Sequence, residues 1–127
     1  MAAEEFVETV SRVLIDELPE YLRLKLQRLN DGDETFEHVM GDLYNTVGQY
    51  NAQFWGLAAE VRNTDNWLAN AVTAYSEVYF YGAINHALDT VRLRNPRTHD
   101  FNVVFDAMEK ALEDLFVETE RIYRQNH

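Results

Sequence analysis

The chain has 127 residues, 46% of them hydrophobic and 13% aromatic, and 22 acidic residues against 11 basic ones give a formal net charge of −11. This length allows one domain, residues 1–127, with a buried core, and the apolar content excludes a wholly disordered chain. The negative charge opposes binding to nucleic-acid backbones and to anionic membranes, because both contacts need Lys and Arg.

No targeting or membrane-spanning segment is expected. The first residues, MAAEEFVETV, lack the basic and apolar regions of a signal peptide. No apolar run approaches the ~20 residues that span a bilayer. The chain has no cysteine, which excludes disulfides, thiolate metal sites and cysteine nucleophiles. We therefore expect a cytoplasmic protein.

The first expected helix begins close to the N-terminus. Phe6, Val10 and Leu14 start a series of apolar residues spaced three or four positions apart, which continues to Leu29. Pro19 lies within this series. Since proline has no N–H and clashes with the preceding turn, it should kink the helix or start a second one.

A second helix is expected after the turn NDGD, residues 30–33. Asp33 or Thr35 has the side chain to cap its first turn. Apolar spacing continues from residue 39 to residue 61, and Gly48 is expected to break or bend the helix there.

The third expected helix covers residues 67–93, after a turn in which Thr64 or Asp65 can act as the cap. It is apolar on more than one face, which is typical either of a central helix or of one that contacts a partner. Core packing explains its aromatic residues better than base stacking does, because a stacking platform needs a basic groove. A homodimer through 67–93 remains an alternative, since Tyr, Trp and Phe are enriched at interfaces.

The last expected helix begins after residue 100 and has a buried stripe from Phe101 to Tyr123. No strand-like alternation extends beyond a few residues. The predicted fold is therefore all-α, a compact bundle of four to five helices with short loops.

No cofactor or metal site is expected. Di-metal helical bundles use Glu-x-x-His pairs. The residues three positions before His38, His86 and His99 are Thr35, Ala83 and Pro96, so that motif is missing. The chain also lacks a glycine-rich phosphate loop.

The segment Arg94-Asn95-Pro96-Arg97-Thr98-His99 has the pattern Arg-polar-x-x-x-His, and it lies between a long helix and a final amphipathic one. In this it resembles HEPN domains, a family of small helical bundles. The resemblance implies a metal-independent ribonuclease. Arg94 would hold the scissile phosphate, and His99 would move a proton at the 2′-hydroxyl or at the leaving oxygen. Alternatively, the cations offset the dipole of the preceding helix and Pro96 ends it.

Carboxylates gather in two stretches that are candidates for binding a partner. No Lys or Arg occurs between Arg28 and Arg62, and the acidic residues there include Asp31, Asp33, Glu34, Glu37 and Asp42. In the last helix, four carboxylates follow a spacing that places them on one outer stripe, with neighbours roughly 5–6 Å apart, comparable to successive phosphates, and a wider gap before the last of them. They are Asp106, Glu109, Glu113 and Glu120. The alternative is an ordinary solvated helix face.

The segment 45–58, NTVGQYNAQFWGLA, follows an acidic turn and precedes a long helix. Its hydrophobic pattern, with Asn45, Val47, Tyr50 and Ala52, resembles the Ocr-like antirestriction proteins of phages. These are small acidic helical DNA mimics. The resemblance implies a protein that occupies a groove built for nucleic acid.

We therefore predict a non-catalytic acidic protein that binds the basic, nucleic-acid-binding surface of another protein. Phage or plasmid inhibitors of host defence, of the antirestriction or anti-CRISPR kind, and nuclease-immunity proteins act in this way. It would itself contact neither nucleic acid nor membrane. Two alternatives stay open: a HEPN-like ribonuclease using Arg94 and His99, and a helical dimer with a structural or assembly role.

Overall fold

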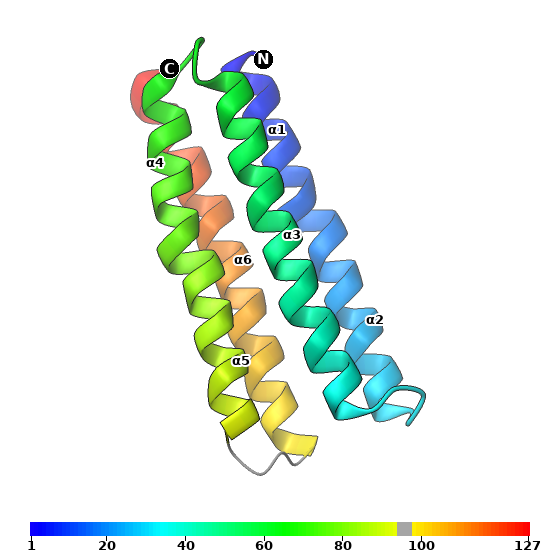
Figure 1. Ribbon diagram of the computed structural model, residues 1–127. Helices are drawn as coiled ribbons and strands as arrows, with labels where there is room; N and C mark the ends of the chain where they lie inside the picture. The colour runs from blue at the N-terminus through cyan, green and yellow to red at the C-terminus, as the bar shows by residue number, and fades with distance from the viewer. Residues whose placement is uncertain (94–97) are drawn as a thin grey trace.

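The computed structural model describes residues 1–93 and 98–127, and the side chains of residues 1–92 and 102–127. All regular structure in these residues is helical. The helices form four antiparallel rods (Figure 1). The prediction of an all-α bundle of four to five helices is confirmed.

The first rod runs through α1 (Ala3–Arg12), a π-helical segment η1 (Val13–Glu17) and α2 (Leu18–Asn30). A second helix, α2, begins at Leu18 with Pro19 in its first turn, as predicted, although the backbone stays helical through η1 between α1 and α2. Proline has no N–H to continue the hydrogen-bond ladder and its ring clashes with the preceding turn, so the regular ladder is interrupted next to it. In this rod, the irregular hydrogen bonding is confined to η1, just before Pro19.

The second rod is α3 (Phe36–Val61), which is uninterrupted, so the expected break at Gly48 is wrong. A helical glycine costs about 1 kcal/mol relative to alanine. Burial of Val47 and Phe54 on either side of Gly48 outweighs that cost. The helix starts as predicted at Thr35, whose hydroxyl accepts a hydrogen bond from the His38 N–H at 3.2 Å.

The third rod consists of α4 (Asn66–Ser76), a π-helical segment η2 (Glu77–Gly82) and α5 (Ala83–Leu93), and the fourth is α6 (Thr98–Asn126). Asp65 caps α4, because its carboxylate accepts a hydrogen bond from the Leu68 N–H at 3.0 Å. The apolar pattern locates α6, although the helix begins earlier than that pattern requires.

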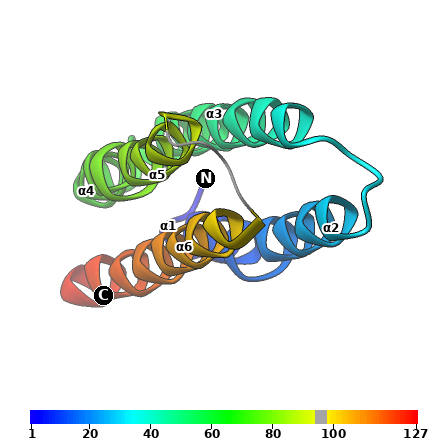
Figure 2. The same cartoon turned by 90° about the horizontal axis from the view of Figure 1, so that it is seen from below.

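The rods lie in two layers that Figure 2 shows end-on. One layer pairs α3 with the α4–η2–α5 rod, and the other pairs α6 with the α1–η1–α2 rod. Both termini lie at the end of the bundle where α3 turns into α4. One cluster of buried side chains fills the space between the layers; its largest fully buried members are Phe6, Phe54 and Phe80.

Buried positions recur in the first and third rods at one constant separation along the chain. The pairs are Phe6 and Val72, Leu14 and Phe80, Leu18 and Ile84, and Leu22 and Leu88. Lys25 and Val91 have the same separation along the chain and are both buried, but Lys25 is charged whereas Val91 is apolar.

Candidate functional site

The first set of predicted carboxylates lies where the α2–α3 turn meets the start of α3. Asp31, Asp33 and Glu37 are exposed, and none has an ion-pair partner in the described part of the chain. Gly32, with φ of 77°, allows the reversal between Asp31 and Asp33. These three side chains are available to an external partner.

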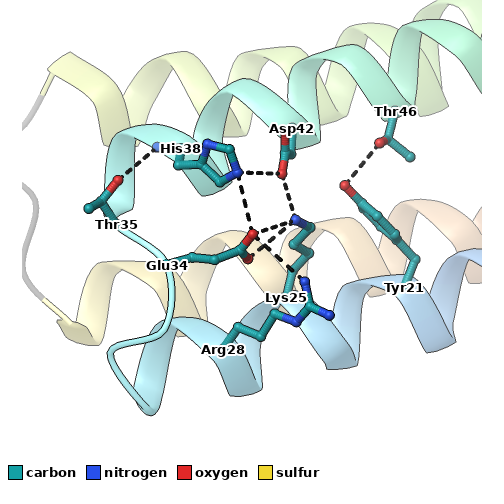
Figure 3. Close-up of polar contacts among 8 residues, drawn as sticks. All are labelled: Tyr21, Lys25, Arg28, Glu34, Thr35, His38, Asp42 and Thr46. Atoms are coloured by element: carbon teal, nitrogen blue, oxygen red, sulfur yellow. Dashed lines mark hydrogen bonds and ion pairs between the residues drawn. The ribbon is translucent and has the colours of Figure 1, made fainter.

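The other two members of this set, Glu34 and Asp42, are bound inside the protein by Lys25 (Figure 3). The Lys25 ammonium lies 3.0 Å from Glu34 Oε1 and 2.5 Å from Asp42 Oδ2, and only 8% of its side chain is exposed. Arg28 contributes a further contact with Glu34 at 3.9 Å. His38 Nε2 lies 3.4 Å from both carboxylates.

The pKa values follow from this geometry. Burial acts to lower the pKa of Lys25, but hydrogen bonds to Asp42 and Glu34 outweigh it and raise the pKa above 10.5. The hydrogen bond from Lys25 lowers the pKa of Asp42 below its ordinary 3.8, against the opposing effect of burial. Both groups are therefore held in their charged forms at neutral pH.

Ligand atoms of Glu34, His38 and Asp42 lie within 4.8 Å of one another, close enough to share a metal ion. However, the Lys25 ammonium already binds both carboxylates. A metal ion that used the two carboxylates would have to displace that ammonium, so this cluster is better described as an internal ion-pair network.

Sequence reasoning missed Lys25 as the partner of these acids, because it lies on α2, well before the stretch that contains no Lys or Arg. The signal was nevertheless present. Lys25 follows Leu18 and Leu22 with helical spacing, so it continues the apolar stripe of the first rod. A lysine at such a position needs an anionic partner when buried.

The second predicted set lies on α6. Asp106, Glu109 and Glu113 are exposed and form no ion pair among the described residues. Glu120 differs, because its carboxylate accepts a hydrogen bond from Arg124 at 2.8 Å. The three unpaired carboxylates are spaced to occupy one side of a straight helix, as the sequence pattern predicted.

An apolar groove lies beside these carboxylates, where α6 packs against η1. It has a volume of about 260 Å³, and Ile15 is 52% exposed there. We call it the acidic groove, after the two glutamates in its otherwise apolar lining. Its lining residues are Leu14, Ile15, Pro19, Glu109, Leu112, Glu113 and Phe116. Sequence reasoning missed the apolar members, because only the packing of η1 on α6 brings them together.

The segment resembling HEPN domains falls largely outside what the structure describes. Arg94 lies outside the described residues, and so does the side chain of His99. The ribonuclease interpretation of Arg94 and His99 stays a prediction.

The aromatic-rich helix 67–93 has two different faces. Its core face is fully buried and includes Leu68, Phe80 and Leu88. On its outer face, Trp67, Val78 and Tyr79 are 54%, 58% and 56% exposed. Core packing therefore accounts for only part of its apolar surface.

Comparison with known proteins gives no match to any family model, curated protein or solved structure. No helix in the described part of the chain is both long and apolar enough to cross a bilayer. The features that bear on function are therefore the α6 carboxylates, the acidic groove and the outer aromatic face, since Lys25 already binds two members of the first carboxylate set.

Proposed function

We propose that this protein is a non-catalytic acidic inhibitor that occupies the basic, nucleic-acid-binding surface of a partner protein. The observation that carries the proposal is the acidic groove. Its exposed apolar floor lies beside the α6 carboxylates Asp106, Glu109 and Glu113, which have no internal partner in the described residues.

The carboxylates supply long-range attraction. A formal charge of −11 steers a cationic surface toward the protein. Side chains three and four residues apart on α6 place negative charge at intervals of roughly 5–6 Å, a repeat similar to that of a nucleic-acid strand. Because α6 is a helix buried along its inner face, it holds this spacing before binding, so little order is lost when a partner docks.

The groove contributes binding free energy that ion pairs alone do not provide. Surface ion pairs contribute little net affinity, whereas an apolar or aromatic anchor in a desolvated pocket contributes most at an interface. An aliphatic side chain, or the methylene stem of an arginine, would contact Ile15 and Phe116 while the guanidinium meets Glu109 or Glu113. A basic amphipathic segment combines both features.

The decisive experiment captures the partner from a native lysate with tagged protein, in about 50 mM and about 500 mM salt. The test variant is Asp106→Asn/Glu109→Gln/Glu113→Gln. The matched control is Asp31→Asn/Asp33→Asn/Glu37→Gln, which removes three exposed carboxylates at the end of the bundle. We expect a partner that is recovered at low salt, lost at high salt, lost with the α6 variant and retained with the control.

The recovered partner is then tested for competition. Its own DNA or RNA should displace the protein from it, since both would occupy the same basic surface. Capture that is equal at both salt concentrations would contradict the electrostatic mechanism. A stable ternary complex of partner, nucleic acid and this protein would contradict the shared site.

A further inference from the structure

The outer face of the third rod is almost free of charge in a chain that is otherwise strongly acidic. Between residues 66 and 88, Glu77 is the one Asp, Glu, Lys or Arg. Its carboxylate accepts hydrogen bonds from Asn51 Nδ2 and Trp55 Nε1, both at 3.1 Å, so it is directed toward α3. We call the exposed surface of this rod the neutral face; its residues are Trp67, Asn70, Ala74, Val78, Tyr79 and Ala83.

The neutral face extends from the third rod onto the adjacent part of α6. Tyr75 and Tyr79 pack together with ring centroids 4.7 Å apart. Farther along, His86 and Ala87 of α5 form a shallow groove of about 260 Å³ with Val103 and other residues of α6. Val103 is 65% exposed. The surface is therefore two helices wide beside His86 and Val103, whereas beside Tyr75 the adjoining side chains of α6 include the charged residues Asp114, Glu118 and Arg121.

We propose that the neutral face is the contact between two copies of this chain. Each copy carries a formal charge of −11, so the two repel each other wherever carboxylates are brought together. Along the third rod, where Glu77 is the one Asp, Glu, Lys or Arg between residues 66 and 88, the neutral face keeps that repulsion low. A cationic partner would gain no electrostatic attraction from it, whereas a second copy matches it in both charge and hydrophobicity.

The shape of the face also suits a twofold pairing. Two copies that meet antiparallel around Ala74 and Val78 would place the Trp67 ring of one copy near Ala83 of the other, a large side chain against a small one. The twofold makes this contact twice. Trp and Tyr are enriched among the residues that contribute most to such contacts.

The small size of the face is compatible with a weak dimer only. The stretch from Trp67 to His86 is roughly 30 Å long; it is roughly 10 Å wide, the width of one helix, over most of that length and roughly 20 Å wide beside Val103. Each copy would thus bury about 400 Å², roughly half of the ~800 Å² per partner of a standard interface. We expect a weak dimer, with a Kd of about 10–100 μM.

Sedimentation equilibrium from about 1 to about 300 μM tests this, in about 50 mM and about 500 mM salt. We expect reversible dimerisation that becomes at least about threefold tighter at high salt, because salt screens the repulsion between copies. This salt dependence is opposite in sign to that expected for the basic partner, so failure of either proposal leaves the other standing.

The test variant Val78→Asp places a carboxylate at the centre of the face, and we expect it to weaken dimerisation at least tenfold. Leu24→Asp is the matched control, since Leu24 is 43% exposed on α2, away from the face, and should leave the Kd unchanged. Circular dichroism would verify that both variants are folded. A monomer at every concentration and salt would overturn the proposal, as would a dimer that Val78→Asp leaves intact or that both variants weaken equally.

Discussion

Tyr44 on α3 donates its phenolic hydrogen to the carboxylate of Asp89 on α5. Burial and this carboxylate raise the pKa of Tyr44 from 10.0 to about 12, although the nearby Arg92 acts in the opposite direction. A group whose folded pKa is raised stabilises the fold below its unfolded pKa. That contribution is lost as pH rises through the folded value, here between pH 10 and about 12.

We therefore predict that Tyr44 is among the last of the seven tyrosines to ionise in the folded protein. Alkaline titration followed by the ultraviolet absorbance of tyrosinate should show a step near pH 12 that Tyr44→Phe removes. The variant Tyr79→Phe is the control, because Tyr79 is exposed, and it should leave that step in place. Persistence of the step in Tyr44→Phe would show that another phenol is the more strongly protected one.

Lys25 allows a second prediction at the level of single residues. Lys25→Met should lower the free energy of unfolding by about 1–3 kcal/mol, because Glu34 and Asp42, whose side chains are only 13% and 31% exposed, lose their nearest cation and keep only the longer contacts with Arg28 and His38. Lys110→Met is the control: its pair with Asp114 is exposed, and the change should be below about 0.5 kcal/mol. Urea unfolding measures both.

Adding Glu34→Gln and Asp42→Asn to Lys25→Met should restore most of the lost stability, since an apolar or neutral set can replace an ion-pair network of this kind. Lys25 is 7% exposed, so the methionine side chain would remain buried there.

The difference in free energy of unfolding between wild type and Lys25→Met should shrink in acid, as pH falls through the lowered pKa of Asp42. A Lys25→Met protein as stable as wild type at pH 7 would mean that the network contributes nothing to folding.

At the level of elements, the apolar spacing predicted the helices well, because each rod buries one continuous stripe. The π-helical segments could not be predicted in this way. A π-helical turn contains one extra residue, which rotates the following apolar stripe by only part of a turn. Packing against neighbouring helices determines at which residue this extra turn position occurs. The uninterrupted helix through Gly48 has the same cause, since tertiary packing outweighs local propensity.

In the two carboxylate sets, too, local features could be predicted from the sequence, whereas features that depend on tertiary packing could not. Spacing within α6 is local, so the sequence placed Asp106, Glu109 and Glu113 on one side of that helix. Ion pairing is not local: Lys25 reaches Glu34 and Asp42 from another rod, and the contact depends on how α2 and α3 are packed. The stretch without Lys or Arg therefore made that end of the bundle look more negative in the sequence than it is in the structure, where Lys25 lies beside Glu34 and Asp42.

The whole molecule has two unlike sides. The acidic groove lies between η1 and α6, and the neutral face lies on the third rod and the adjoining part of α6. A dimer through the neutral face would leave both acidic grooves open to solvent. The two proposals are thus compatible, and a dimer would present two grooves to a partner that has repeated basic sites, with a gain in avidity.

The unpaired carboxylates should also lower the stability of the fold at low salt. Carboxylates kept unpaired for binding repel one another in the folded protein, so the midpoint of urea unfolding should rise between about 50 mM and about 500 mM sodium chloride. For the same reason, Asp106→Asn/Glu109→Gln/Glu113→Gln should be more stable than wild type at low salt, by about 0.5–1 kcal/mol, even though it is the variant expected to lose the partner. Destabilisation of that variant would instead mean that these side chains make contacts the fold requires. In that case, its loss of binding could be caused by the damaged fold and would not identify these carboxylates as a binding surface.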